Sequence, residues 1–229
     1  FYNKLINFQQ KACFVATHHL QKRGGVIIGD VVGLGKTITA IAVAKIMEED
    51  FYLETLIICP KNLTQMWEDY AHKYQLHAKI ISQSVVQNEL PELRRYRLVI
   101  IDESHNLRNS EGVRYRAIKE YIFKNESKVI MLTATPYNKS FIDLSNQLRL
   151  FIADDADLGI SPDEYIKQIG GQVKFNAQHN DIFIRSIKAF EKSNLADDWR
   201  ELMRLYLIRR TRSFIKSNYA KIDPQDNKP

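Results

Sequence analysis

Short, uninterrupted runs of apolar residues recur along the first part of the chain, separated by longer amphipathic stretches. The clearest runs are 26–28, 55–59, 98–101 and 129–132, and 78–81 is a weaker fifth. Runs of this length without polar alternation are typical of strands that are buried on both faces of a parallel sheet.

The stretches between these runs have the spacing of amphipathic helices. We predict helices over 36–47, 63–74 and 113–123, with Asn62 as the N-cap of the second. Strands that alternate with helices of this length predict right-handed crossovers and a doubly wound, mostly parallel α/β sheet. In such sheets, ligands bind beyond the carboxyl ends of the strands.

Near residue 150 the pattern becomes mostly helical and more polar. It predicts helices over 143–151, 181–191 and 197–208 and a helix start at 161–164, with Gly170 and Gly171 as a break. We therefore predict a sheet-containing lobe over 1–150, a helical extension over 151–216 and a frayed tail over 217–229.

Composition narrows this picture only slightly. A chain of 229 residues is long enough for one large domain, or for a domain with a small appendage. The net charge of +6 permits a polyanionic partner but does not require one. No apolar run approaches the roughly 20 residues that span a bilayer, so no membrane partner is expected. The start, Phe1 to Lys4, has neither Met nor a signal-peptide layout, so we interpret the chain as a fragment of a protein that is not secreted.

A glycine-rich turn follows the first strand and opens a helix, which is the context that a phosphate-binding loop requires. In such a loop, backbone amides surround the phosphates, Lys36 reaches the terminal phosphates and the Thr37 hydroxyl holds Mg²⁺. The full pattern has Gly where Asp30 stands here, and the alternative is an ordinary strand–turn–helix with a surface lysine. The candidate nucleotide-binding residues of this loop are Asp30, Val32, Gly33, Leu34, Gly35, Lys36 and Thr37.

Two carboxylates end the strand over 98–101. Asp102 is the candidate Mg²⁺ ligand together with Thr37, and Glu103 would polarise the attacking water. Alone, the pair is equally consistent with a solvated acidic turn, but a phosphate loop upstream favours a catalytic role. Thr133 and Thr135 end the fourth strand, where their hydroxyls are candidates for coupling the acids to the terminal phosphate; a capped turn is the alternative.

Together, the glycine-rich turn, the segment Asp102-Glu103-Ser104-His105 and the segment from Thr133 to Pro136 resemble the superfamily-two helicase-related ATPases, and most closely the Swi/Snf-type translocases, including bacterial members. In that family an Asp commonly stands where Asp30 does, and Val31 departs from its usual acid. The resemblance implies an N-terminal RecA-like lobe that binds ATP and Mg²⁺, with His105 linking the ATP site to other motifs.

Further segments fit the same resemblance. Gln9 corresponds to the glutamine that reads the adenine edge. The segment 57–60 with Trp67 resembles a motif that approaches DNA, which makes Lys61 a candidate contact. Arg209 and Arg210 lie in a segment that resembles the basic motif at the end of the lobe, where nucleic-acid contact, an interlobe role and a salt-bridged helix face all remain open.

By this resemblance the chain is one lobe of an ATP-dependent translocase or remodeller of duplex DNA. It would hydrolyse ATP only when a second RecA-like lobe of the full-length chain completes it, so the isolated lobe is expected to be nearly inactive. Further subunits of a larger complex are possible partners, and the location would be cytoplasmic in a prokaryote or nuclear in a eukaryote. The alternatives are a strand-separating RNA or DNA helicase and a nucleotide-gated binding module without turnover.

Other notable side chains have simpler interpretations. Cys13 and Cys59 are expected to be small core residues of a reducing compartment, with no disulfide between them. His72, His77 and His179 have no metal-ligand spacing, so no zinc site is expected. Trp67 is expected to pack in the core and not to stack on a base.

Overall fold

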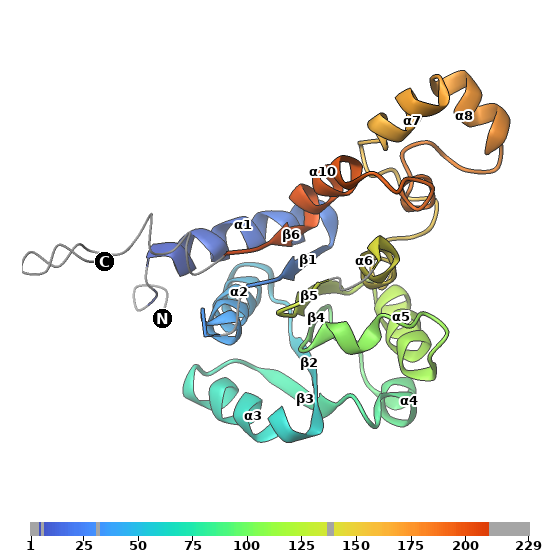
Figure 1. Ribbon diagram of the computed structural model, residues 1–229. Helices are drawn as coiled ribbons and strands as arrows, with labels where there is room; N and C mark the ends of the chain where they lie inside the picture. The colour runs from blue at the N-terminus through green and yellow to red at the C-terminus, as the bar shows by residue number, and fades with distance from the viewer. Residues whose placement is uncertain (1–4, 6, 31–32, 137–139, 211–229) are drawn as a thin grey trace, which may run out of the picture.

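A parallel sheet forms the centre of the structure (Figure 1). The computed structural model describes residues 5, 7–30, 33–136 and 140–210. Within these residues the sheet has six strands in the order β3-β2-β4-β5-β1-β6, and every neighbouring pair is parallel. The strands are β1 (Gly25–Ile28), β2 (Thr55–Cys59), β3 (Ala78–Ser82), β4 (Leu98–Ile101), β5 (Lys128–Leu132) and β6 (Leu207–Ile208). All five predicted runs form strands, which confirms the predicted α/β class, and the fold is RecA-like.

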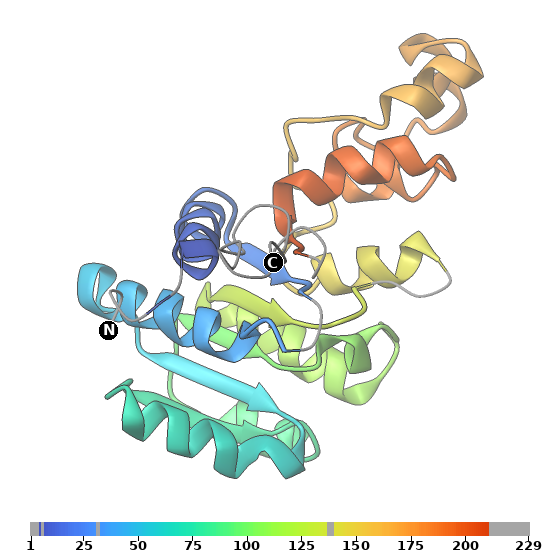
Figure 2. The same cartoon turned by 60° about the vertical axis from the view of Figure 1, so that its left-hand side comes forward.

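Helices cover both faces of this sheet (Figure 2), as the uninterrupted apolar strands predict. One face is packed by α1 (Asn7–Arg23), α2 (Lys36–Phe51) and α3 (Thr64–Lys73). The other is packed by α4 (Val86–Glu89), α5 (Val113–Asn125), α6 (Phe141–Leu148) and α10 (Ala196–Tyr206). Successive residues of one strand enter opposite cores, as Ile27 and Ile28 do.

Short helical turns lie in three of the connections: η2 (Lys61–Leu63), η3 (Leu90–Glu92) and η4 (Ser104–Leu107). Because η2 precedes α3, the helix begins at Thr64 and its N-cap position is Leu63, so the predicted Asn62 cap is wrong. Likewise α6 begins two residues before the predicted 143–151 helix and ends at Leu148.

A small helical unit extends away from the sheet (Figure 1). It contains α7 (Asp163–Ile169), α8 (Gln172–Gln178) and α9 (Ile187–Phe190), packed around Ile166, Phe175 and Ala189. The predicted break is confirmed, because Gly170 ends α7 with a φ of 96° and Gly171 precedes α8.

Two predicted helices in this region are wrong in extent. Only α9 forms within 181–191, because Arg185 is drawn into a loop: its carbonyl accepts from the Leu158 amide at 2.9 Å and its guanidinium pairs with Asp157. The predicted 197–208 helix ends at Tyr206, and Leu207 and Ile208 become β6. The Gly29 amide donates to the Ile208 carbonyl at 2.7 Å. This short strand therefore supplies hydrogen-bond partners for the backbone groups along the outer edge of β1.

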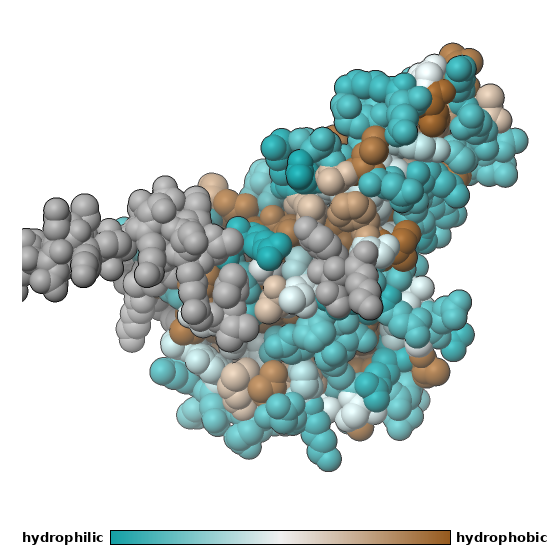
Figure 3. Space-filling model, viewed as in Figure 1, coloured by the Kyte–Doolittle hydropathy of each residue, from teal (hydrophilic) through white to brown (hydrophobic). Residues whose placement is uncertain are grey.

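The division of the chain at residue 150 remains a prediction, and 211–229 lie outside the described residues. Among the described residues, none of the helices combines the length and the hydrophobicity that a membrane-spanning segment needs. On the face drawn in Figure 3, hydrophobic residues lie in small groups among hydrophilic ones, which is the usual composition of a protein surface.

Candidate nucleotide site

The glycine-rich turn connects the carboxyl end of β1 to the first residue of α2. Gly33 and Gly35 have φ angles of 90° and 76°, a left-handed conformation that side chains rarely adopt. A Cβ built on Gly35 would lie 2.5 Å from the Gln9 Nε2 atom, so α1 holds the Gln9 amide against the turn. The structure thus brings the predicted adenine reader Gln9 and the phosphate loop together. Leu34 and Thr37 are partly buried, and Val32 lies outside the described residues.

Lys36 is the first residue of α2, at the helix end where the backbone dipole is positive. Its Nζ atom donates to the Asp30 carbonyl at 2.9 Å, so the lysine side chain reaches across the turn. This places an ammonium group and the helix N-terminus on the same small loop, and both favour an anion.

Asp102 directly follows β4 and is almost fully buried. Its Oδ2 atom accepts from Trp67 Nε1 at 2.9 Å, and its Oδ1 atom accepts from the Glu103 amide at 2.9 Å. Burial raises the pKa of this carboxyl; these two hydrogen bonds and the charges of Lys36 and His105 lower it, and the net direction is upward. The glycine-rich turn and the acidic segment leave the same carboxyl edge of the sheet, because β1 and β4 are parallel and only β5 lies between them.

The acidic segment and the Thr133–Pro136 segment are in direct contact. Glu103 has a φ of 48° and precedes η4, and its carboxylate pairs with His105 Nδ1 at 3.0 Å. The same ring nitrogen lies 3.4 Å from Thr133 Oγ1, and that hydroxyl accepts from the Thr135 amide at 3.1 Å. A continuous chain of polar contacts therefore runs from Glu103 to Thr135.

Several residues that support the acidic segment were not predicted from the sequence. Trp67 is buried in the core as predicted, but it also donates to Asp102. Gln83 Nε2 donates to the Asp102 carbonyl at 2.6 Å. Ser104 Oγ donates at 2.8 Å to Gln147, a fully buried residue of α6 that also donates to the Pro136 carbonyl. Glutamines outside a motif give no sequence signal, which is why these supports become visible only in three dimensions.

A second link involves Arg108, which follows η4. Its guanidinium donates to the Thr135 carbonyl and, at 3.1 Å, to the Thr135 hydroxyl. The two predicted coupling threonines are therefore contacted by different residues: Thr133 by His105 in the acidic segment, and Thr135 by Arg108 just after η4.

The predicted nucleic-acid or interlobe residues have different surroundings. Lys61 and Arg209 are exposed, whereas Arg210 is buried in an ion pair with Asp30. Their roles remain predictions, but an Arg210 side chain that is engaged in this way is not a free surface charge.

The oxygen donors at this site fit Mg²⁺. Thr37 and Asp102 supply a hydroxyl and a carboxylate, the ligand types that this hard cation prefers. A divalent cation would also offset the burial that raises the pKa of Asp102, because positive charge stabilises the ionised carboxylate.

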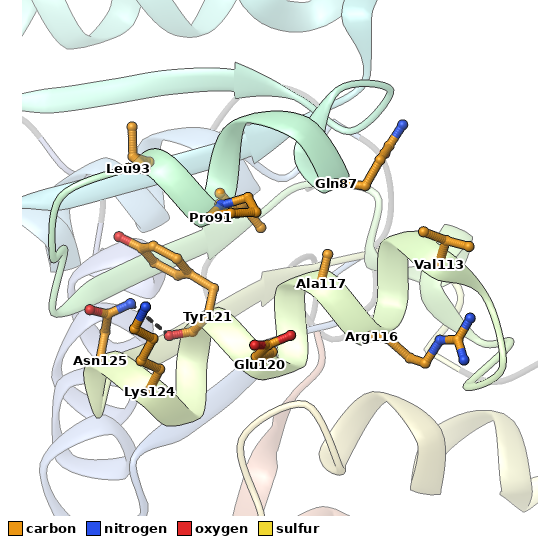
Figure 4. A pocket seen from close by; sticks show the side chains of 11 residues that line it. Gln87, Pro91, Leu93, Val113, Arg116, Ala117, Glu120, Tyr121, Lys124 and Asn125 are labelled. Atoms are coloured by element: carbon orange, nitrogen blue, oxygen red, sulfur yellow. Dashed lines mark hydrogen bonds between the residues drawn. The ribbon is translucent and has the colours of Figure 1, made fainter.

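Other notable features lie outside this site. Both cysteines are free and buried, and burial raises the pKa of each thiol to about 12. A hollow of about 330 Å³ lies between the segment 87–93 and α5, and its lining includes Pro91, Ala117 and Tyr121 (Figure 4). None of its lining residues belongs to the phosphate loop or the acidic segment.

The parallel sheet, the glycine-rich turn after β1 and the acidic residues after β4 are the arrangement that a P-loop ATPase lobe requires. The sequence matches the SNF2-related domain over residues 8–89 and the type III restriction enzyme, res subunit, over 75–138. These matches support a likeness to the superfamily-two, Swi/Snf-type helicase-related ATPases.

Individual relatives agree with this assignment. The chain is 25% identical over 171 residues to the SWI/SNF-related matrix-associated actin-dependent regulator of chromatin subfamily A-like protein 1 homolog of Caenorhabditis elegans, covering 64% of this chain and 24% of the relative. It is 29% identical over 157 residues to the uncharacterized ATP-dependent helicase YqhH of Bacillus subtilis, covering 59% of this chain and 28% of the relative. The chain thus spans less than a third of the length of these relatives.

Solved structures support the fold. The Sulfolobus solfataricus SWI2/SNF2 ATPase core in complex with dsDNA superposes with a TM-score of 0.63 at 21% identity, covering 91% of this chain and 44% of that one. A second structure, described as the Sulfolobus solfataricus SWI2/SNF2 ATPase core domain, superposes with a TM-score of 0.61 at 22% identity and has the same coverage.

Proposed function

We propose that this chain is the ATP-binding lobe of a motor that moves along or remodels double-stranded DNA, and that it hydrolyses ATP to ADP and phosphate once a second RecA-like lobe completes the site. The observation that carries the proposal is that the glycine-rich turn after β1 and the carboxylates after β4 leave the same carboxyl edge of the parallel sheet, with only β5 between the two strands. A lysine on a glycine-rich turn and a buried carboxylate on a neighbouring loop are the two halves of an Mg·ATP site.

Each half has its own task. The backbone amides of the turn and the first turn of α2 bind the phosphates, and Lys36 neutralises their charge. Thr37 and Asp102 would hold Mg²⁺, which when bound neutralises charge on the phosphate oxygens. Glu103 orients the attacking water and accepts its proton.

The contacts around Glu103 suggest how hydrolysis is coupled to movement. Its partner His105 touches Thr133, and Thr135 is tied to Arg108. If the Glu103 side chain moves when the terminal phosphate is lost, His105 and then Thr133 would have to move with it, because they are in contact. We propose that Thr133 and Thr135 transmit it toward the second lobe and the DNA.

Duplex DNA is the proposed partner because of the relatives. One solved neighbour is described as a complex with dsDNA, and the human relative, 26% identical over 162 residues, is named a DNA annealing helicase and endonuclease. Exposed Lys61 and Arg209 are the candidate contacts on this lobe.

The direct test is DNA-stimulated ATP hydrolysis by the full-length protein. Lys36→Ala should abolish turnover because the terminal phosphates lose their countercharge, and Glu103→Gln should lower kcat about 100-fold or more because the water loses its base. Glu111→Gln, an exposed carboxylate outside the site, is the matched control and should keep normal rates. Normal turnover by either site variant would refute the assigned roles.

The second candidate is a strand-separating helicase, and it is favoured by relatives whose printed names include "helicase". The same site would power either activity. A fluorescent duplex-unwinding assay on the full-length protein separates the two: the proposed translocase hydrolyses ATP without separating the strands, whereas a helicase releases one strand.

A further inference from the structure

A buried ion pair joins Asp30, which follows β1 and Gly29, to Arg210, the last residue that the structure describes. Asp30 is completely buried and the Arg210 side chain is 8% exposed. Arg210 Nε lies 3.0 Å from each Asp30 carboxylate oxygen, Nη2 also donates to Oδ2, and the Arg210 amide donates to Oδ1 at 2.8 Å. The two residues are 180 positions apart in the sequence.

The location of this pair matters more than its strength. Asp30 lies between β1 and the glycine-rich turn, where general P-loop patterns have glycine. An unpaired carboxylate next to a triphosphate would repel it, and an unpaired buried carboxylate is unstable in any case. Arg210 removes both difficulties by neutralising Asp30 with a guanidinium that is itself nearly buried.

Asp30 also contacts Lys36, the candidate phosphate-binding lysine. The Asp30 carbonyl accepts from Lys36 Nζ at 2.9 Å, while its carboxylate accepts from Arg210. Asp30 therefore connects the end of the described chain to the principal phosphate-binding side chain through one backbone unit.

Strand β6 fixes the register of this connection. Leu207 and Ile208 pair with Ile27 and Ile28, and the Gly29 amide donates to the Ile208 carbonyl at 2.7 Å. A Cβ on Gly29 would lie 2.8 Å from Leu207 Cδ1, so the glycine permits the close approach. The segment 207–210 thus follows β1 directly into the phosphate loop.

We propose that Arg210 is a positioning residue for the phosphate loop: it anchors Asp30, and through it the start of the turn and the resting contact of Lys36. This inference rests on the proposed function, because it assumes that the turn binds ATP. It follows that a displacement of Arg210 would shift Asp30 and so alter the nucleotide site. Conversely, nucleotide binding would alter the position of Arg210.

The test is the affinity of the full-length protein for Mg·ATP, measured with a fluorescent ATP analogue beside the thermal midpoint of each variant. Arg210→Met should weaken binding about 10-fold or more, and Arg210→Lys should recover part of the loss, because lysine restores the charge but not the forked geometry. Arg149→Met is the matched control: Arg149 is a part-buried arginine that follows α6, away from the glycine-rich turn, and it pairs with Glu191 at 2.9 Å. It should lower the midpoint without changing the affinity.

A second variant keeps the test informative if Arg210→Met does not fold. Asp30→Asn with Arg210→Met removes both charges, so no charge is left unpaired, yet the anchor is still lost and weak binding is expected. Unchanged affinity in a folded Arg210→Met or double variant would overturn the inference and leave the proposed function intact. No Mg·ATP binding by the unaltered protein would instead overturn the proposed function, and this inference with it.

Discussion

At the scale of single residues, Gly35 is subject to two separate constraints. Its φ of 76° is unfavourable for a side chain, and the Gln9 Nε2 atom lies only 2.5 Å from where a Cβ would stand. Gly35→Ala is therefore expected to cost about 1–2 kcal/mol of stability from backbone strain, and also to displace Gln9 and weaken ATP binding.

Gly159→Ala separates these two effects. Gly159 has nearly the same φ, 77°, but nothing lies within 4 Å of its would-be Cβ. Both variants should lose stability in urea unfolding, and only Gly35→Ala should lose affinity for the fluorescent nucleotide. Equal nucleotide affinities for the two variants would contradict the prediction that displacing Gln9 weakens ATP binding.

Trp67 gives a pH-dependent prediction at the same scale. Burial raises the pKa of Asp102, and the hydrogen bond from Trp67 opposes this rise. Trp67→Phe removes that bond, so the pKa of Asp102 should rise further. Because Mg²⁺ binds the ionised carboxylate, the acid limb of Mg·ATP affinity should move to higher pH.

Trp199→Phe is the control for this experiment. Trp199 is equally buried, and its indole Nε1 donates to the Ser193 carbonyl at 2.9 Å, outside the site. It should lose stability without moving the pH profile of Mg·ATP affinity. A profile that is the same for Trp67→Phe and the unaltered protein would show that the hydrogen bond does not tune Asp102.

Much of the site could be predicted at the residue scale, because phosphate and metal chemistry restrict which residues can serve. Asp102, Glu103, His105 and Thr133 form successive polar contacts, as the motifs suggest, while their catalytic roles and that of Lys36 stay predictions. The supports Gln83 and Gln147 could not be predicted, because hydrogen bonds from isolated polar side chains depend on packing that no local pattern encodes.

At the scale of elements, helix α2 is fixed at its far end by Glu48. Its Oε2 atom pairs with Lys45 at 2.6 Å, and its Oε1 atom accepts from the His77 amide at 2.9 Å. Burial raises the pKa of Glu48, but the hydrogen bonds from Lys45 and His77 outweigh it and the net direction is downward. These contacts connect α2 to the loop before β3.

A lowered carboxyl pKa contributes stability that is fully present above the ordinary glutamate pKa and is lost as the pH falls through the lowered value. Glu48→Gln should therefore cost about 1 kcal/mol near pH 7 and progressively less in acid. Urea unfolding from pH 7 to pH 3 measures this. Glu49→Gln is the control, since Glu49 is 66% exposed, and should show little change. A pH-independent loss for Glu48→Gln would contradict the ionic contribution.

At the scale of elements, some strands and helices could be predicted from the sequence and others could not. Strands β1, β2, β4 and β5 could be predicted because each is a short apolar run that is buried on both faces, whereas the edge strand β3 is only partly buried and gave a weaker pattern. Strand β6 could not, because two residues at the end of an amphipathic helix have no pattern of their own. The predicted 181–191 helix failed because contacts of Arg185 with residues distant in sequence outweigh local helical spacing.

At the scale of the whole molecule, two hydrophobic cores on opposite faces of the sheet hold the phosphate loop and the acidic segment at the same edge. The central claim is that both segments bind one Mg·ATP. It is tested most directly by crystals grown with Mn²⁺ and a non-hydrolysable ATP analogue, using the anomalous signal of the manganese. We predict one manganese peak between the Thr37 hydroxyl and the Asp102 carboxylate, in contact with the analogue's phosphates. A nucleotide bound at the loop with its metal away from Asp102, or a nucleotide bound elsewhere, would contradict the account.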